Sequence, residues 1–147
     1  MNKMYYEATV KYRKTSGEGV QKVVSENYLV EGHSFTEAES NINREIVAYI
    51  SEEFRVTNIK LTNYSEIISS EDGDRWFKAK VTLVSYNEET GKEGKTNIYL
   101  LVQANDAKNA YENTAEAMRT TMGNYNIPSV SETNIMEVFL NKNDRTL

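Results

Sequence analysis

Two short stretches decide the fold of this chain: YYEATV at residues 5–10 and WFKAKV at residues 76–81. Each begins with an aromatic pair and continues with alanine and valine at alternate positions, and the second follows the first by 71 positions. Alternation of apolar and polar residues is the pattern of a half-buried strand. Two such strands at this spacing predict that the chain contains the same structural unit twice.

Further matches continue along both halves in the same order. Val30, Ala38, Ile46 and Ile50 correspond to Val102, Ala110, Met118 and Met122 at a spacing of 72, and the spacing returns to 71 from Phe54 with Tyr125 to Ile68 with Phe139. One inserted and one removed residue account for the change. Ordered matches across a whole half favour a duplication over the alternative, two unrelated α+β halves.

Each half has the pattern of two strands joined by a hairpin, then a helix, then a third strand. In the first half, Ser34 and Glu37 have the spacing of a capping box at the start of the helix. The third strand is expected at residues 56–68, and Pro128 is expected to act as a stop after the second helix. The apolar residues expected to form the core against Tyr6, Val10, Phe77 and Val81 are Phe35, Ala38, Ile42, Ile46, Ile50, Ala110, Met118 and Met122.

These patterns predict an α+β fold, a tandem duplication of a ββαβ unit with antiparallel sheets, one helix per repeat and pseudo-two-fold symmetry. The expected organisation is a first repeat at 1–68, a linker at 69–74, a second repeat at 75–140 and a C-terminal tail at 141–147, in one compact two-lobed domain. Right-handed crossover connections predict the strand order 2-1-3 with every neighbour antiparallel. Because half of 147 residues buries too little core alone, we expect one six-stranded sheet or helices packed together.

Composition excludes several classes of site. With 39% hydrophobic and 27% charged residues, the chain has the balance of a globular protein, and its net charge is -5. It has no cysteine, which excludes disulfides and thiolate metal sites, and a single histidine, His33, which excludes a histidine cluster. We therefore expect no metal and no cofactor. We also expect a cytoplasmic location with no membrane contact and no targeting segment.

Basic and aromatic residues gather on the strand faces opposite the expected core. The residues with these properties are Tyr5, Lys11, Arg13, Trp76, Lys78 and Lys80. Proteins that bind single-stranded nucleic acid stack bases on exposed rings while lysine and arginine follow the phosphates. The alternative is an ordinary solvated strand face, where charged residues keep a sheet soluble.

Four runs of sequence carry a resemblance to a known family. They are Tyr28-Leu29-Val30-Glu31, Ser34-Phe35-Thr36-Glu37-Ala38-Glu39, Asp74-Arg75-Trp76-Phe77-Lys78 and Leu101-Val102-Gln103-Ala104. From Met4 to Phe139 the chain resembles the domain-of-unknown-function family 4494, a family of uncharacterised proteins of gut bacteria. The resemblance implies a bacterial origin, and it points to no enzyme family and to no assigned catalytic or binding residue.

Three hypotheses of function follow. The first is a small non-enzymatic binding or protein-interaction module with a protein partner. The second is a binder of single-stranded nucleic acid that uses the six strand-face residues. The third is an enzyme with a cleft between its lobes that uses glutamate, tyrosine and lysine. A homo-oligomer is compatible with each of them.

Overall fold

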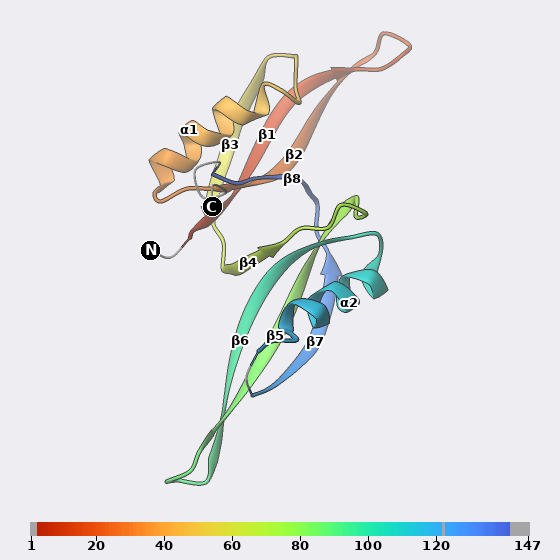
Figure 1. Ribbon diagram of the computed structural model, residues 1–147. Helices are drawn as coiled ribbons and strands as arrows, with labels where there is room; N and C mark the ends of the chain where they lie inside the picture. The colour runs from red at the N-terminus through yellow and green to blue at the C-terminus, as the bar shows by residue number, and fades with distance from the viewer. Residues whose placement is uncertain (1–2, 122, 142–147) are drawn as a thin grey trace. The chain divides into compact units, whose positions relative to one another are not determined.

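The computed structural model of the chain describes residues 3–121 and 123–141 and shows an α+β fold (Figure 1). This described part contains eight strands and two helices. In chain order they are β1 (Tyr5–Thr15), β2 (Gln21–Glu31), α1 (Phe35–Ile46), β3 (Phe54–Leu61), β4 (Tyr64–Ile68), β5 (Arg75–Asn87), β6 (Lys92–Ala104), α2 (Ala107–Met118), β7 (Asn124–Glu132) and β8 (Ile135–Phe139). The expected fold class is confirmed.

The chain divides into two compact units. Unit 1 runs to Thr62 and resumes at Asn134, whereas unit 2 is the continuous segment Asn63–Thr133. Each unit holds one four-stranded sheet, with the order β3-β1-β2-β8 in unit 1 and β4-β6-β5-β7 in unit 2. These bounds differ from the expected repeats at 1–68 and 75–140, and segment 69–74 joins β4 to β5 inside unit 2. The structure has two four-stranded sheets, so the six-stranded sheet, one of the two expected arrangements, does not form.

In unit 1, α1 packs against one face of the sheet. The Ser34 hydroxyl caps this helix by accepting a hydrogen bond from the backbone N–H of Glu37 at 3.1 Å. The Glu37 carboxylate does not complete the capping box but accepts a hydrogen bond from Asn141 Nδ2 at 3.4 Å. The buried core consists of Tyr6, Ala8, Val10, Tyr28, Val30, Ala38, Ile42, Ile46, Ile50 and Phe139.

In unit 2, α2 packs against its own sheet in the same way. Asp106 is the N-cap, and its carboxylate accepts a hydrogen bond from the backbone N–H of Asn109 at 2.8 Å. Thr114 is buried among apolar residues, and its hydroxyl donates to the Ala110 carbonyl one turn earlier at 2.7 Å, so its polar group is satisfied. Its core clusters contain the buried residues Phe77, Ala79, Val81, Leu100, Val102, Ala104, Ala110 and Met118.

The last strand of each half of the chain belongs to the sheet of the other unit. β4 follows β3 but runs parallel to β6 of unit 2, and β8 follows β7 but runs parallel to β2 of unit 1. The expected third strand at 56–68 therefore breaks at Thr62 into two strands, and the expectation that every neighbour is antiparallel is wrong. The order 2-1-3 is confirmed, because β3 lies beside β1 and β7 lies beside β5.

Equivalent residues make equivalent contacts in the two units. Thr62 donates its N–H and its hydroxyl to the Tyr5 carbonyl, and Thr133 donates the same two groups to the Trp76 carbonyl. In the parallel pairs, Val138 lies opposite Leu29 and Phe139 opposite Val30, as Ile67 lies opposite Leu101 and Ile68 opposite Val102. The sequence spacings of 71 and 72 relate all of these residues, which favours the duplication.

Three local expectations have different outcomes. Phe35 is 51% exposed rather than buried, because it is the first residue of α1 and lies at the end of the helix, where it lines a small groove beside β3. Pro128 does not follow α2 as a stop but lies within β7, an edge strand in which its missing N–H removes no ladder bond. Met122 lies outside the described residues.

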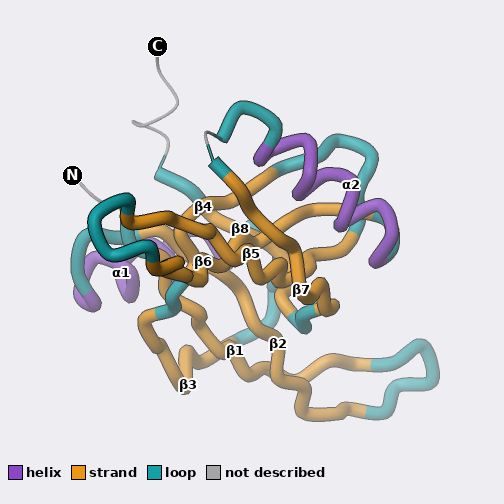
Figure 2. Tube along the Cα trace, turned by 90° about the horizontal axis from the view of Figure 1, so that it is seen from below, coloured by secondary structure: helices purple, strands orange, loops and turns teal. Residues whose placement is uncertain are grey.

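Both hairpins extend beyond their helices. Figure 1 shows β1 with β2, and β5 with β6, continuing as two-stranded ribbons past the part of each sheet that a helix covers, and Figure 2 shows the β1–β2 ribbon from a second direction. β1 pairs with β2 as far as Thr15 opposite Gln21, but its pairing with β3 ends at Tyr12 opposite Phe54. The ribbon of unit 1 therefore extends beyond Phe54, the first residue of β3.

Candidate functional site

A groove of about 480 Å³ lies in unit 1 beside β1, next to Phe54 at the start of β3. Its wall comes from β1, from the returning strand β2 and from the loop that leads into β3. The lining residues are Lys11, Tyr12, Arg13, Thr15, Gln21, Val23, Glu52, Glu53, Phe54 and Arg55. We call this feature the β1 groove.

Three cationic side chains of the β1 groove lie on one face of the sheet. Val10 is buried against α1, so alternation places Lys11 and Arg13 on the opposite face. Arg55 lies directly opposite Lys11 in the β1–β3 register and therefore shares that face. All three side chains are exposed, and none forms an ion pair or a side-chain hydrogen bond with any described residue. Their charges are available to a ligand.

An open backbone edge runs along the same groove. Successive residues of a central antiparallel strand direct their N–H and C=O groups alternately to its two neighbours. The Tyr5 carbonyl accepts from Thr62 on the β3 side, and the β1–β2 register continues without a shift to the end of β1. The backbone N–H and C=O groups of Arg13 and Thr15 therefore point away from β2. Pairing with β3 stops at Tyr12, so these groups have no strand partner within the described chain.

Comparison with known proteins identifies the family of the chain. The sequence profile of the family called domain of unknown function DUF4494 matches residues 4–142, which is nearly the whole chain. The chain belongs to the DUF4494 family. No curated protein and no solved structure matches it.

On the α1 face of the sheet, this DUF4494 chain has a polar cluster of Tyr12, Glu26 and Tyr28, of which Tyr12 also lines the β1 groove. Tyr28 Oη donates to Glu26 Oε1 at 2.9 Å. Burial, and then the hydrogen bond to Glu26, raise the pKa of Tyr28, and the same two causes in the same order raise the pKa of Tyr12. Both phenols therefore remain neutral donors at neutral pH, and the Glu26 carboxylate is their shared acceptor.

The six residues proposed from the sequence are divided between the two units. Tyr5, Lys11 and Arg13 belong to unit 1, whereas Trp76, Lys78 and Lys80 belong to unit 2. Tyr5 and Trp76 are each only 5% exposed, so neither ring offers an open face on which a base could stack. Of the six, Lys11 and Arg13 line the β1 groove.

Lys78 has aromatic partners within unit 2. Its Nζ atom lies 5.6 Å from the centre of the Tyr64 ring and 4.7 Å from the centre of the Tyr99 ring. These are cation–π distances, so the ammonium group already interacts with two rings of its own unit. Lys80 lies two residues further along the same strand and is half-buried.

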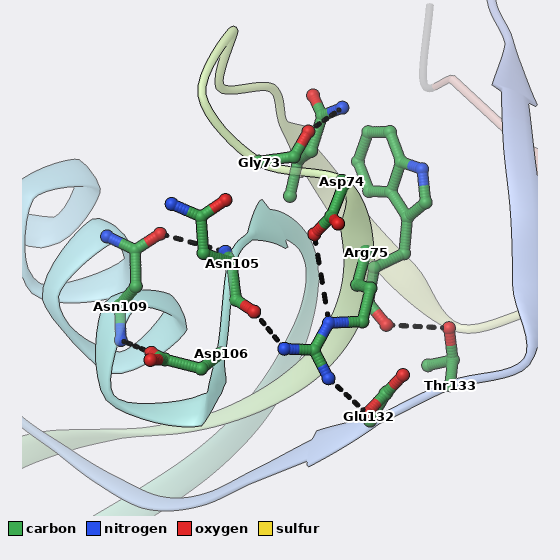
Figure 3. Close-up of polar contacts among 10 residues, drawn as sticks. Gly73, Asp74, Arg75, Asn105, Asp106, Asn109, Glu132 and Thr133 are labelled. Atoms are coloured by element: carbon green, nitrogen blue, oxygen red, sulfur yellow. Dashed lines mark hydrogen bonds and ion pairs between the residues drawn. The ribbon is translucent and has the colours of Figure 1, made fainter.

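A second polar cluster surrounds Arg75 at the start of β5, and Figure 3 shows its contacts. Arg75 Nη1 lies 3.1 Å from Glu132 Oε1, its Nε lies 3.7 Å from Asp74 Oδ1, and its other terminal nitrogen donates to the Asn105 carbonyl. The guanidinium therefore connects β7 to the residue before the N-cap of α2. Because all three nitrogens have partners within unit 2, this arginine links segments of its own unit.

Sequence reasoning missed several residues of the β1 groove. Arg55, Phe54 and Val23 come from β3 and β2, and their proximity to Lys11 depends on strand register. The register of β1 with β3 shifts between Thr9 and Val10. No local pattern in the sequence predicts this irregularity. The available signal was the excess of basic residues in the first hairpin, which identified Lys11 and Arg13.

Other classes of site can be described only for residues 3–121 and 123–141. In that range no group of three or more histidine, cysteine, aspartate or glutamate residues could hold a metal ion. No helix in the same range is long and apolar enough to cross a membrane. The enzyme hypothesis and the homo-oligomer hypothesis stay predictions that none of these contacts tests.

Proposed function

We propose that this DUF4494 chain is a small non-enzymatic binding module that takes up an extended segment of a partner protein along the open edge of β1. The observation that carries the proposal is the continuation of β1 beyond the end of β3, which leaves the backbone groups of Arg13 and Thr15 facing the β1 groove. An extended segment can add itself to such an edge, and main-chain hydrogen bonds then supply its affinity.

The shape of the site supports strand addition. The incoming segment would continue the line of β3 beyond Phe54, in the position next to β1 that β3 leaves empty. Val23, opposite Arg13 on β2, is 60% exposed and also lines the groove, so it adds apolar surface to the site. Exposed edges are often blunted by proline or a bulge, and the described end of β1 has neither.

The proposal includes a cytoplasmic location and a bacterial origin. A chain without cysteine is typical of a reducing compartment, because small secreted domains depend on disulfides. The bacterial origin rests on the family resemblance alone.

The experiment selects peptides from a displayed random library with the full chain and then maps the selected peptides by NMR. The decisive variant is Thr15→Pro, because proline removes the N–H that faces the open side while the β1–β2 ladder keeps the bonds of the neighbouring residues. The matched control is Tyr86→Pro, which places proline 71 positions later on the corresponding strand of unit 2.

We expect the selected peptides to shift the amide signals of Arg13 and Thr15, to lose affinity for Thr15→Pro and to retain affinity for Tyr86→Pro. Selected peptides that bind Thr15→Pro as tightly as they bind the unchanged chain would overturn the proposal. A library that yields no peptide binding in solution would overturn it as well.

A further inference from the structure

Resting on the function proposed above, we propose that the partner segment is acidic and presents carboxylates at alternate positions to the cations of the β1 groove. Residues of an extended segment alternate between the two faces of a sheet. A segment added beside β1 would place every second side chain on the face that carries Lys11, Arg13 and Arg55. Those three cations have no partner of their own among the described residues.

The stability of the fold does not account for these cations. Lys11 and Arg55 lie directly opposite each other, and like charges at opposed positions destabilise an antiparallel pair. Lys14 and Lys22 form a second like-charge pair across the same ribbon. A ligand that carries negative charge would relieve this repulsion when it binds.

Unit 2 shows that the same framework forms without cations at the equivalent positions. At the sequence spacings of 71 and 72, Thr82 and Asn126 replace Lys11 and Arg55, and they also lie directly opposite each other. The second like-charge pair is replaced by Ser85 opposite Gly94, and Arg13 is replaced by Val84. Cations at these positions are therefore found in unit 1 and not in unit 2, whose ribbon forms with Lys92 and Lys95 at other positions. They are not needed to form a ribbon of this kind.

The groove contains two acidic residues that must be counted against this charge. Glu52 and Glu53 line the groove in the loop before β3. Neither carboxylate forms an ion pair with a described cation. Even when both carboxylates are assigned to the face of Lys11, Arg13 and Arg55, the three cations outnumber them.

The whole chain is acidic, with a net charge of -5, but this does not oppose the recognition of an acidic segment. Salt screens charges that lie more than about 8 to 10 Å apart at physiological ionic strength, so a bound carboxylate responds to the nearest cations. Arginine can also hold a carboxylate with two parallel hydrogen bonds, which fixes the register of the segment as well as its charge.

The test uses the full chain and a fluorescent octapeptide in which glutamate alternates with valine or threonine. Its comparison peptide has glutamine in place of every glutamate, and an oligothymidylate of similar length is the nucleic-acid probe. The charge variants are Arg13→Gln and Arg55→Gln, the edge variant is Thr15→Pro, and the matched control is Lys95→Gln on the ribbon of unit 2. Fluorescence anisotropy measures each affinity at low and at high salt, and circular dichroism verifies that each variant is folded.

We expect the acidic peptide to bind about tenfold more tightly than the glutamine peptide, because a charge-assisted hydrogen bond is worth about one factor of ten or more. Arg13→Gln and Arg55→Gln should each remove most of this preference, Thr15→Pro should weaken both peptides, and Lys95→Gln should change neither. High salt should reduce the preference for the acidic peptide.

Every other outcome overturns either strand addition, the acidic preference or both. Equal binding of the two peptides, with both lost in Thr15→Pro, leaves strand addition in place and overturns the acidic preference. Acidic-peptide binding that depends on Arg13 but not on Thr15→Pro overturns strand addition, and with it the alternating register proposed here. No binding of either peptide, or tighter Arg13-dependent binding of the oligothymidylate, overturns the inference.

Discussion

Ile46 and Val47 are neighbours at the end of α1 with opposite environments. Ile46 is completely buried in the core of unit 1, whereas Val47 is 62% exposed. The helical period of the sequence predicted this difference, because Ile46 continues the apolar stripe and Val47 does not. The same helical period wrongly predicted that Phe35 is buried. Phe35 is the first residue of α1, and at the start of a helix membership of the apolar stripe does not ensure burial.

We expect Ile46→Ala to destabilise unit 1 by about 2 to 5 kcal/mol, because truncation leaves a cavity that the surrounding core fills only in part. Urea unfolding followed by circular dichroism measures the change. Val47→Ala is the matched control and should stay within about 0.5 kcal/mol of the unchanged chain. Similar losses for the two variants would contradict the packing of α1 described above.

Tyr28 predicts how stability depends on pH in alkaline solution. Burial, and then the hydrogen bond to Glu26, raise its pKa above the ordinary value of 10.0. A pKa that is higher in the folded state than in the unfolded state gives stability that is complete below about pH 10 and is lost as the pH rises further. The free energy of unfolding should therefore fall above pH 10, and it should fall less steeply in Tyr28→Phe.

The measurement is denaturant unfolding at a series of alkaline pH values. Tyr86→Phe, which alters a side chain that is 65% exposed, should leave the pH dependence unchanged. An identical slope in Tyr28→Phe and in the unchanged chain would exclude Tyr28 as the source of the dependence.

Among the elements, β4 and β8 are the strands whose sheet the sequence does not predict. The hairpins, the two helices and the place of β3 and β7 beside the first strand of each half follow from period, caps and crossover handedness. The exchange of β4 and β8 does not follow. Ile67 and Val138 occupy equivalent positions and pair with the equivalent residues Leu101 and Leu29, so the local sequence of either strand suits either sheet. The choice depends on pairing between distant segments, which periodicity cannot report.

Phe139 tests how much β8 contributes to unit 1. Its ring stacks on Tyr28 with the ring centres 5.8 Å apart and also contacts Tyr49 at 5.3 Å. We expect Phe139→Ala to cost about 3 to 5 kcal/mol, as for other large buried aromatic residues. Met136→Ala changes a residue of the same strand that is 56% exposed and should cost far less. Thermal unfolding that does not distinguish the two variants would show that β8 does not stabilise the sheet.

At the scale of the whole chain, the two units differ in continuity. Unit 2 is one segment, Asn63–Thr133, whereas unit 1 needs β8 from the end of the described chain. We therefore expect a fragment of residues 63–133 to unfold cooperatively, and a fragment of residues 75–140 to do so poorly because it lacks β4. Circular dichroism and calorimetry compare the two fragments, whose lengths are similar. A more stable 75–140 fragment would show that the repeat of the sequence, rather than the unit of the structure, is the folding unit.

The exchange of β4 and β8 also reverses the order in which the two units can be completed on the ribosome. Translation produces β1, β2, α1 and β3 first, but the sheet of unit 1 then waits for its fourth strand through the whole synthesis of unit 2. During this interval the β2 edge has no neighbour and Tyr28 lacks its stacking partner Phe139. Unit 2 begins later, yet all its strands have emerged before β8 is made. The nascent chain therefore exposes an uncapped sheet edge in unit 1 until β8 has been synthesised, the stage at which a chaperone would protect it from pairing with another chain.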